Sequence, residues 1–423
     1  MSNSPQTGPL VGTRVLELCS TIAGPACARL LADFGAEVIK VEPPEGDSVR
    51  RLGVSDEGVA LYAASILRNK RVVTIDIKTA EGQALVRQLA AQCDIVVENF
   101  RPGTLERLGL GYEALSKDHP GLIMVRISGY GQTGPYSAKA GYGAICEAFG
   151  GVREMIGDPD RPPVRVAVPV TDYITAAYAA FGTTMALLER QRTGLGQVVD
   201  TALYEAAFTM MEATVPGYDR FKVSPTREGS RLPFMAPNNL YRASDGAYLL
   251  IGANNEATYK RLTETMQRPD LLSDPRFASI GVRWQHVDAL DAEVGAWVAQ
   301  HTARDGAALL EAAGVPASLV YTLADIFKDP HYRAREMLLE VPHPKLKTLT
   351  QMGIVPRLSA TPGHVAWPGH DAGADTRAVL GEWLGIGSAE LDRLEMAGVI
   401  RCNADASAMP PDGALHMPDT KTK

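Results

Sequence analysis

The chain is poor in the residues that build disulfide frameworks and thiolate metal sites. Its 423 residues include five cysteines, and no two of them form a C-x-x-C pair; they are Cys19, Cys27, Cys93, Cys146 and Cys402. An odd and scattered set argues against a disulfide-stapled fold and against a structural zinc site. We therefore expect a cytoplasmic protein with no metal site.

Long apolar runs and an excess of basic residues are also lacking. The least polar stretch, residues 173–188, contains three threonines and a glycine and is shorter than the roughly 20 residues that span a bilayer. The first ten residues show no secretion signal. The net charge is −7, from 42 basic and 49 acidic residues, which is not typical of nucleic-acid or membrane-surface proteins. We expect neither kind of partner.

Several common catalytic and nucleotide-binding motifs are absent. The sequence has no G-x-x-x-x-G-K-[ST], H-E-x-x-H or G-x-S-x-G segment, and the first turn at 21–25 is not G-x-G-x-x-G. A dinucleotide site of the usual form is therefore disfavoured. Seven of the eight histidines follow residue 285, so a histidine base in the first part of the chain is not expected.

What is present in the first third is an alternation of strands and helices. A strand at 15–18, a helix ending at Gly35 and a strand at 37–42 make a βαβ unit of fewer than 30 residues, which predicts parallel strands. Thr79 can cap a further helix that runs through Ala91. The remaining predicted strands of this part are 72–75, 94–97 and 121–127. This pattern predicts an α/β fold with a doubly wound, Rossmann-like parallel sheet.

Shifts in composition predict a second, smaller domain. Residues 215–239 are rich in Pro, Arg, Gly and Asn, and mainly helical patterns follow. We expect a large domain that begins with 1–205, a linker at 206–225, a small domain at 226–330, a return to the large domain at 331–402, and a disordered tail at 403–423.

Three features are candidates for chemistry. Asp172 opens a long apolar helix, where it can act as a helix cap or as an ionised nucleophile. Basic residues near predicted strand ends, among them Lys78, Arg101 and Arg107, can bind phosphates or form a solvated surface. The glycine-rich loop at 129–135 permits either a tight turn or the close approach of a substrate.

Seven segments carry a resemblance to a known family. They are A-G-P-A-C-A-R-L-L-A-D-F-G-A-E-V-I-K-V-E at 23–42, N-K-R at 69–71, D-I-K-T-A-E-G at 76–82, V-E-N-F-R-P-G at 97–103, I-S-G-Y-G-Q-T-G-P at 127–135, G-Q-V-V-D at 196–200 and A-G-V-I at 397–400. Together they resemble the family III CoA-transferases over about residues 8–402. Residues 140–151, 161–166, 230–239 and 329–337 resemble the branch that acts on dicarboxylates with succinyl-CoA as donor, and Ile22 and Pro43 depart from the formyl-CoA enzymes.

The resemblance implies a mechanism and a set of site residues. The nucleophile of the family falls on Asp172, which would carry CoA as an aspartyl thioester between an acyl-CoA donor and a small dicarboxylic acid. Oxyanion donors are expected from the loops at 129–134 and 236–254. Arg231 is the candidate partner for the distal carboxylate, and Tyr142 is expected in the substrate site. The implied CoA contacts are Ala23, Ile75, Lys78, Asn99, Phe100, Arg101, Arg107, Ser128, Gly129, Tyr130 and Gly131.

The resemblance also implies an assembly and leaves two other functions open. Members form homodimers of two interlocked rings, with no permanently bound cofactor and with CoA thioesters as substrates. One alternative is an α-methylacyl-CoA racemase, but Tyr142 stands where those enzymes have a histidine, and a phenol with a reference pKa of about 10 is a poor base near neutral pH. The other alternative is a CoA-binding protein without catalysis, in which Asp172 is only a cap.

Overall fold

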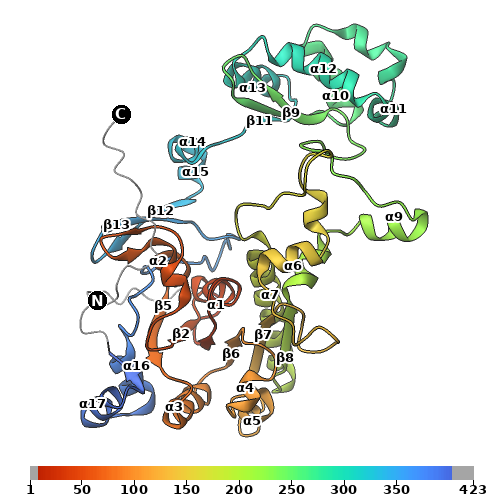
Figure 1. Cartoon of the computed structure of the whole chain (residues 1–423). Helices are drawn as coiled ribbons and strands as arrows, with labels where there is room; N and C mark the ends of the chain where they lie inside the picture. The colour runs from red at the N-terminus through yellow and green to blue at the C-terminus, as the bar shows by residue number, and fades with distance from the viewer. Residues whose placement is uncertain (1–7, 403–423) are drawn as a thin grey trace. The chain divides into compact units, whose positions relative to one another are not determined.

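The computed structural model describes residues 8–402, so the predicted tail at 403–423 lies outside it. The described chain divides into two compact units (Figure 1). Unit 1 consists of residues 8–152, 166–215 and 333–402, and unit 2 consists of residues 153–165 and 216–332. Each unit has a hydrophobic core of its own.

Unit 1 is built on a seven-stranded sheet. The spatial order is β14-β5-β2-β1-β6-β7-β8, and every neighbouring pair is parallel except β14 with β5. The bounds are β1 Arg14–Leu18, β2 Glu37–Glu42, β5 Lys70–Ile75, β6 Ile95–Glu98, β7 Ile123–Ser128, β8 Val198–Ala202 and β14 Ile400–Arg401. The predicted α/β class with a large parallel sheet is confirmed.

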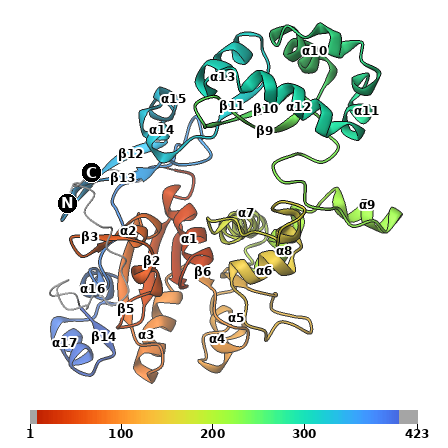
Figure 2. The ribbon, with the colours of Figure 1, turned by 45° about the horizontal axis from the view of Figure 1, so that its top comes forward.

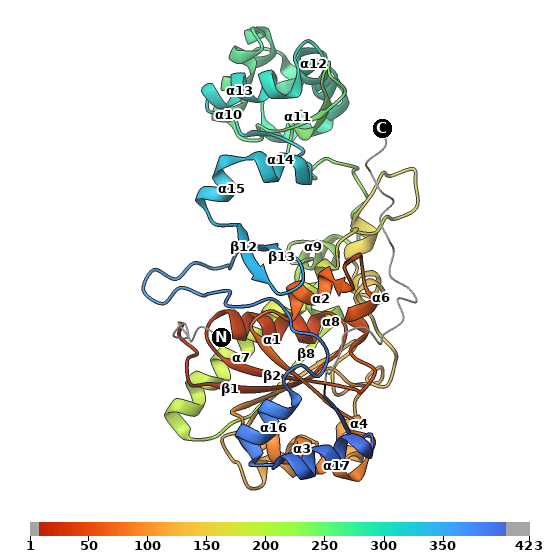
Figure 3. The same ribbon diagram turned by 90° about the vertical axis from the view of Figure 1, so that its left-hand side faces the viewer.

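Helices cover both faces of this sheet (Figure 3). Side chains alternate along each strand, so that Val15 joins one core cluster and Leu16 joins the other. Helices α1 and α7 pack side by side on one face (Figure 2). The bounds on that face are α1 Ala23–Asp33, α2 Leu61–Ile66 and α7 Val170–Thr193, and on the other face α3 Ala80–Ala90, α4 Thr104–Arg107, α5 Tyr112–Ser116, α16 Thr376–Leu384 and α17 Ser388–Met396.

The strand order reverses between β1 and β6. From β1 the chain moves to β2 and β5 on one side, whereas β6 is followed by β7 and β8 on the other. The loops that leave the carboxyl ends of β1 and β6 therefore turn in opposite directions and open a crevice between them, which is where open α/β sheets bind ligands.

The other elements of unit 1 lie in loops around this sheet. They are η1 Ser48–Arg51, β3 Ser55–Asp56, β4 Val59–Ala60, α6 Gly143–Phe149, η2 Val152–Met155, α8 Leu203–Thr209, β12 Leu338–His343 and β13 Lys347–Met352, of which η2 lies at the border with unit 2. Strands β12 and β13 pair as an antiparallel hairpin.

Unit 2 has a three-stranded antiparallel sheet in the order β11-β10-β9. Its core contains residues of α10, α12 and α13. One face of the three strands packs against these helices, and the other face is exposed. The bounds in and beside this unit are α9 Thr214–Phe221, β9 Asn238–Arg242, β10 Tyr248–Gly252, α10 Glu256–Thr265, η3 Pro269–Leu272, η4 Pro275–Phe277, α11 Ile280–Gln285, α12 Val287–Val298, α13 Ala303–Ala312, β11 Ala317–Leu319, α14 Leu323–Lys328 and α15 Pro330–Ala334.

Most predicted elements of the large sheet are present, with shifted ends. Thr79 caps α3 by accepting from the Gly82 N–H at 3.0 Å. The capping position of α7 is Pro169, and Asp172 lies in the first turn, so Asp172 is not the cap. Helix α9 lies in the segment expected to be an irregular linker. No helix among residues 8–402 is long and apolar enough to span a membrane.

Candidate functional site

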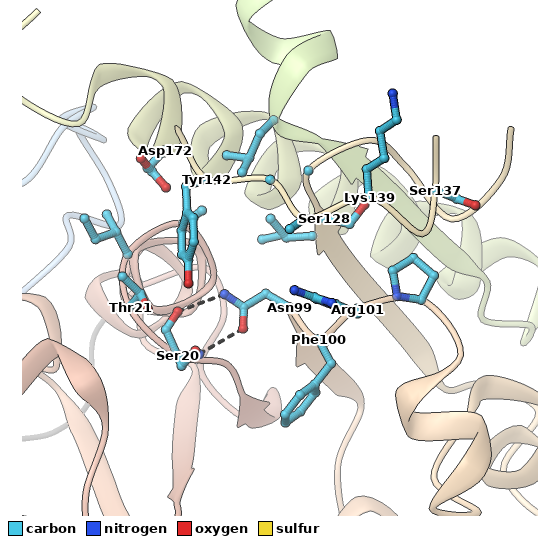
Figure 4. A pocket seen from close by; sticks show the side chains of 18 residues that line it. Ser20, Thr21, Asn99, Phe100, Arg101, Ser128, Ser137, Lys139, Tyr142 and Asp172 are labelled. Atoms are coloured by element: carbon cyan, nitrogen blue, oxygen red, sulfur yellow. Dashed lines mark hydrogen bonds between the residues drawn. The ribbon is translucent and has the colours of Figure 1, made fainter. Parts of the chain in front are cut away.

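A cavity of about 200 Å³ lies where the strand order reverses (Figure 4). Three loops that follow β1, β6 and β7 form its walls, and the segment before α6 and the start of α7 and α8 complete it. The lining residues are Ser20, Thr21, Ile22, Ala23, Asn99, Phe100, Arg101, Pro102, Ile127, Ser128, Gly129, Ser137, Lys139, Ala140, Gly141, Tyr142, Asp172 and Leu203. All of them belong to unit 1.

Asp172 provides the carboxylate of this cavity. It lies in the first turn of α7, and its carboxylate is pressed against Gly143, the first residue of α6. A Cβ added to Gly143 would lie 2.0 Å from Oδ2 of Asp172. The start of α7 therefore places the backbone of Asp172, and the absence of a side chain at Gly143 gives its carboxylate the room that it occupies.

A close contact between two backbone segments places α6 beside the cavity. Gly129 follows β7 and Gly141 precedes α6, and a Cβ on either glycine would lie 2.8 Å from the Cα of the other. The Cys146 thiol on α6 donates to the Gly129 carbonyl at 3.3 Å. Only residues without a side chain permit this approach, which carries Tyr142 and Gly143 to the position of Asp172.

The charge of Asp172 affects its neighbours. Burial, and then the nearby Asp172 carboxylate, raises the pKa of the Cys146 thiol to about 11. Tyr62 bonds to Tyr173 through the two hydroxyl groups at 3.1 Å. Burial and this bond raise the pKa of Tyr62, with a further contribution from Asp172. Both groups are therefore protonated at neutral pH.

The side-chain amide of Asn99 joins the loop after β6 to the loop after β1, at the point where the strand order reverses. The Asn99 side chain accepts from the Ser20 N–H at 2.9 Å and donates to the Ser20 carbonyl at 2.8 Å (Figure 4). These two bonds hold the end of β6 against the end of β1. Asn99 thereby shapes the cavity, whether or not its amide also contacts a ligand.

Arg101 and Lys139 are the two cationic residues among those that line the cavity. Arg101 follows β6, and Lys139 precedes α6 with its Nζ 3.3 Å from the centre of the Tyr136 ring. Guanidinium and ammonium groups bind phosphates and carboxylates through charge-assisted hydrogen bonds. The cavity thus combines one carboxylate with two groups suited to an anionic ligand. Among residues 8–402, no group of three or more His, Cys, Asp or Glu side chains is placed to hold a metal ion.

The cavity brings together eight of the residues expected from the sequence: Asp172, Ala23, Asn99, Phe100, Arg101, Ser128, Gly129 and Tyr142. The other six are not among its lining residues; they are Ile75, Lys78, Arg107, Tyr130, Gly131 and Arg231. Ile75 is buried in the core, and Lys78 and Arg107 are exposed. Gly131 donates to the Ser128 hydroxyl at 2.9 Å, and Tyr130 packs against neighbouring rings. Their binding roles stay predictions.

Arg231 belongs to unit 2, where two carboxylates engage it. Its Nη2 donates to Asp288 at 2.6 Å and its Nε to Asp291 at 2.8 Å. Its expected role toward a distal carboxylate stays a prediction, as does the oxyanion role of residues 236–254, which are also in unit 2. Sequence reasoning missed Lys139 and Gly143, and the only signal for them was their position beside Tyr142 in the glycine-rich segment.

Comparison with known proteins identifies the family. The sequence profile described as "CoA-transferase family III" matches residues 10–376. The chain is 46% identical to the succinyl-CoA–D-citramalate CoA-transferase of Chloroflexus aurantiacus, over 95% of this chain and 100% of that protein. It is 40% identical to the succinyl-CoA:mesaconate CoA-transferase of Haloarcula hispanica, over 80% and 86%. The protein belongs to CoA-transferase family III, and it is an enzyme of the CoA-transferase type.

Solved structures agree with this assignment. A CaiB/BaiF family protein from Brucella suis is 35% identical and superposes with a TM-score of 0.81, covering 89% of this chain and 100% of that one. The protein Rv3272 from Mycobacterium tuberculosis is 30% identical, with a TM-score of 0.79 over 88% and 99%. The family resemblance read from the sequence motifs is confirmed.

Proposed function

We propose that the enzyme transfers CoA from succinyl-CoA to a small dicarboxylic acid, with Asp172 carrying the CoA between them. The relatives named above, and the mouse succinyl-CoA:glutarate CoA-transferase at 34% identity over 93% of this chain, are named for succinyl-CoA as one substrate and a dicarboxylic acid as the other. Their acceptors differ, so similarity supports the class of acceptor rather than one acid.

The observation that carries the proposal is the restrained carboxylate in the cavity. Asp172 lies in the first turn of α7, and its carboxylate packs so closely against Gly143 that a side chain at that position would displace it. A carboxylate is a weak nucleophile, and it gains most from being held in a near-attack geometry. Two nearby cations, Arg101 and Lys139, can bind the anionic parts of the substrates.

The reaction needs four acyl-transfer steps and no external proton. An Asp172 oxygen attacks the thioester carbon of succinyl-CoA, and the C–S bond breaks to give a mixed anhydride and CoA thiolate. The thiolate attacks Cγ of Asp172, which releases succinate and leaves an aspartyl-CoA thioester. The acceptor carboxylate then attacks the same Cγ and frees the thiolate. The thiolate attacks the acceptor acyl carbon, which forms the product thioester and returns the Asp172 carboxylate.

Backbone N–H groups beside Gly129 and at the start of α6 are the candidates for stabilising the oxyanion of each tetrahedral step. The lining residues that the structure describes include no histidine, and Tyr142 faces the cavity in the place of the racemase base. Both observations support transfer over proton exchange at the α-carbon.

Intact-protein mass spectrometry tests the proposal. Incubation with succinyl-CoA is expected to add the mass of CoA less one water to the wild type and nothing to the Asp172→Asn variant. Borohydride added with acyl-CoA should inactivate the wild type, and borohydride without acyl-CoA should leave it active. A panel of dicarboxylic acids then identifies the acceptor through the new thioester. Deuterium uptake next to the thioester without any adduct would reject transfer and support a racemase, and CoA binding without either reaction would support a non-catalytic protein.

We also propose that the enzyme is a homodimer. Helix α7 exposes four apolar side chains at intervals of three and four residues: Tyr178, Phe181, Met185 and Leu188. This spacing places them along one face of the helix, and a contiguous exposed apolar face on a folded chain is typical of a protein interface. A second copy of the chain is the partner that the interlocked-ring assembly of the family requires.

A further inference from the structure

The turn that joins β1 to α1 forms one wall of the cavity in an unfavourable backbone conformation. It contributes Ser20, Thr21, Ile22 and Ala23 to the lining, in the same cavity as Asp172 (Figure 4). Thr21 has a φ of 69°, a left-handed value that β-branched residues rarely adopt. Such a conformation persists only where the surroundings hold it. The contacts on this turn therefore identify the residues that set the shape of the wall.

Two buried lysines hold the ends of the turn. Lys40, on β2, donates to the carbonyl of Cys19 just before the turn. Lys70, on β5, donates to the carbonyl of Pro25 just after it at 2.7 Å. Both side chains are fully buried. They share one carboxylate, Glu17 on β1, whose oxygens lie 3.2 Å from Lys40 Nζ and 2.6 Å from Lys70 Nζ.

Asp47 holds the middle of the turn. Its Oδ1 accepts from the Thr21 N–H at 3.1 Å, and its Oδ2 accepts from Lys40 Nζ at 2.6 Å. The Thr21 and Ser48 hydroxyl groups bond to each other at 3.0 Å. A continuous chain of contacts thus runs from Glu17 in the sheet through Lys40 and Asp47 to the strained residue of the cavity wall.

Stability alone does not account for this arrangement. The desolvation of buried charges offsets their attraction, so that well-packed apolar replacements are often neutral or stabilising. An apolar side chain cannot, however, donate to the Cys19 and Pro25 carbonyls or accept from the Thr21 N–H. These directional bonds end on the turn or on the residues that flank it, so their distinctive effect is on the geometry of the wall.

We propose that Lys40, Lys70 and Asp47 are positioning residues for CoA transfer, which hold the turn at Thr21 in its strained form so that the cavity presents a fixed wall to the reacting thioester. None of the three lines the cavity, so each acts through the turn. The inference rests on the proposed function for its kinetic test but not for its structural test.

The kinetic test is the Lys40→Met variant. It removes the donor to Cys19 and the partner of Asp47, so Thr21 is free to relax. We expect kcat to fall about 100-fold, the effect of misplacing reacting groups by about 1 Å. The KM for succinyl-CoA should stay within about twofold, because Arg101 and Lys139 lie on other loops. The Asp47→Asn variant keeps one acceptor oxygen for the Thr21 N–H, but its NH2 cannot accept from Lys40. It provides a second test with the same expected direction.

A second substitution separates positioning from general damage. Glycine adopts positive φ without a steric penalty, so adding Thr21→Gly to Lys40→Met should recover part of the lost kcat. The matched control is Arg68→Met. Arg68 is also fully buried and is paired with Asp33 at 2.7 Å, but it has no contact with the turn, and its loss should lower stability with kcat within about twofold of wild type.

Hydrogen exchange of the ligand-free enzyme is the structural test. Amides 19–24 and 26 should exchange faster in Lys40→Met or Asp47→Asn than in wild type, and at the wild-type rate in Arg68→Met. A wild type that fails to transfer CoA from succinyl-CoA would reject the proposed function, while the exchange comparison would still test positioning. Unchanged exchange in both turn variants, or an equal loss of kcat in Arg68→Met, would overturn the positioning role.

Discussion

The carboxylate of Asp172 and the Cα of Gly143 are in such close contact that a single added carbon would lie 2.0 Å from Oδ2 and 2.8 Å from Cγ. Position 143 has an ordinary backbone conformation for any residue, since its φ is not among the positive values of the chain. The glycine is therefore needed for space rather than for flexibility. Substitution of Gly143 therefore tests how much freedom the Asp172 carboxylate has.

The Gly143→Ala variant should fold and lose activity. The methyl group has to push the Asp172 carboxylate aside, at a cost to stability of about 1–3 kcal/mol, and we expect kcat to fall about 100-fold. Steady-state kinetics and thermal unfolding measure the two effects. The control is Gly281→Ala in α11, where an added Cβ meets nothing within 4 Å; it should keep full activity and gain about 0.4–1 kcal/mol. Equal kcat in both variants would show that the carboxylate is not restrained.

The five thiols should not react in the native enzyme, because all have a raised pKa. Burial raises the pKa of Cys27 to about 12 and, with the Asp172 and Glu395 carboxylates as second causes, the pKa values of Cys146 and Cys402 to about 11. It also raises those of Cys19 and Cys93. Since the thiolate is the reactive form, a disulfide reagent at pH 8 should label five thiols in guanidinium and none rapidly in the native protein. If one thiol of the native protein reacts rapidly and its modification abolishes CoA transfer, the nucleophile would be a cysteine instead.

The parts of the fold and of the site that the sequence predicts are those encoded by residues close together in the chain. The strand at 37–42 and the Thr79 cap are encoded within a few residues, and both are found where expected. Asp172 was identified through the family motif around it. The bonds between Ser20 and Asn99 join residues 79 positions apart, and only the strand order brings them together. Helix α6 has seven residues and begins with a glycine, so no periodic pattern reveals it or the contact of Gly143 with Asp172.

Disruption of the exposed face of α7 should separate the proposed dimer. Phe181, in the middle of the row, is 60% exposed. A charge there cannot be buried against a second chain without a large desolvation penalty. We expect Phe181→Glu to give half the wild-type mass by light scattering on a sizing column at micromolar concentration. Leu309→Glu, at a similarly exposed position on α13, should keep the wild-type mass. A monomeric wild type would refute the dimer outright.

Titration of His343 should make unit 1 less stable in mild acid. His343 is 7% exposed, and its Nδ1 accepts from the backbone N–H groups of Lys345 and Leu346, both at 3.2 Å. Burial, assisted by the Lys345 charge, lowers the pKa of His343 in spite of Asp371. The unfolded chain, with a histidine pKa of about 6.5, then binds more protons than the folded one just below that pH. Stability should therefore rise with pH and be lost as the pH falls below about 6.5.

Unfolding by urea at several values between pH 5 and pH 7.5 measures this dependence. In His343→Asn, the amide oxygen can still accept from the backbone N–H groups but takes up no proton, so the free energy of unfolding should vary less with pH than in the wild type. The exposed His331 provides the control: His331→Asn should keep the full wild-type dependence. If His343→Asn keeps it too, the acid sensitivity arises elsewhere, and the bonds that hold the β12–β13 hairpin turn do not depend on a neutral imidazole.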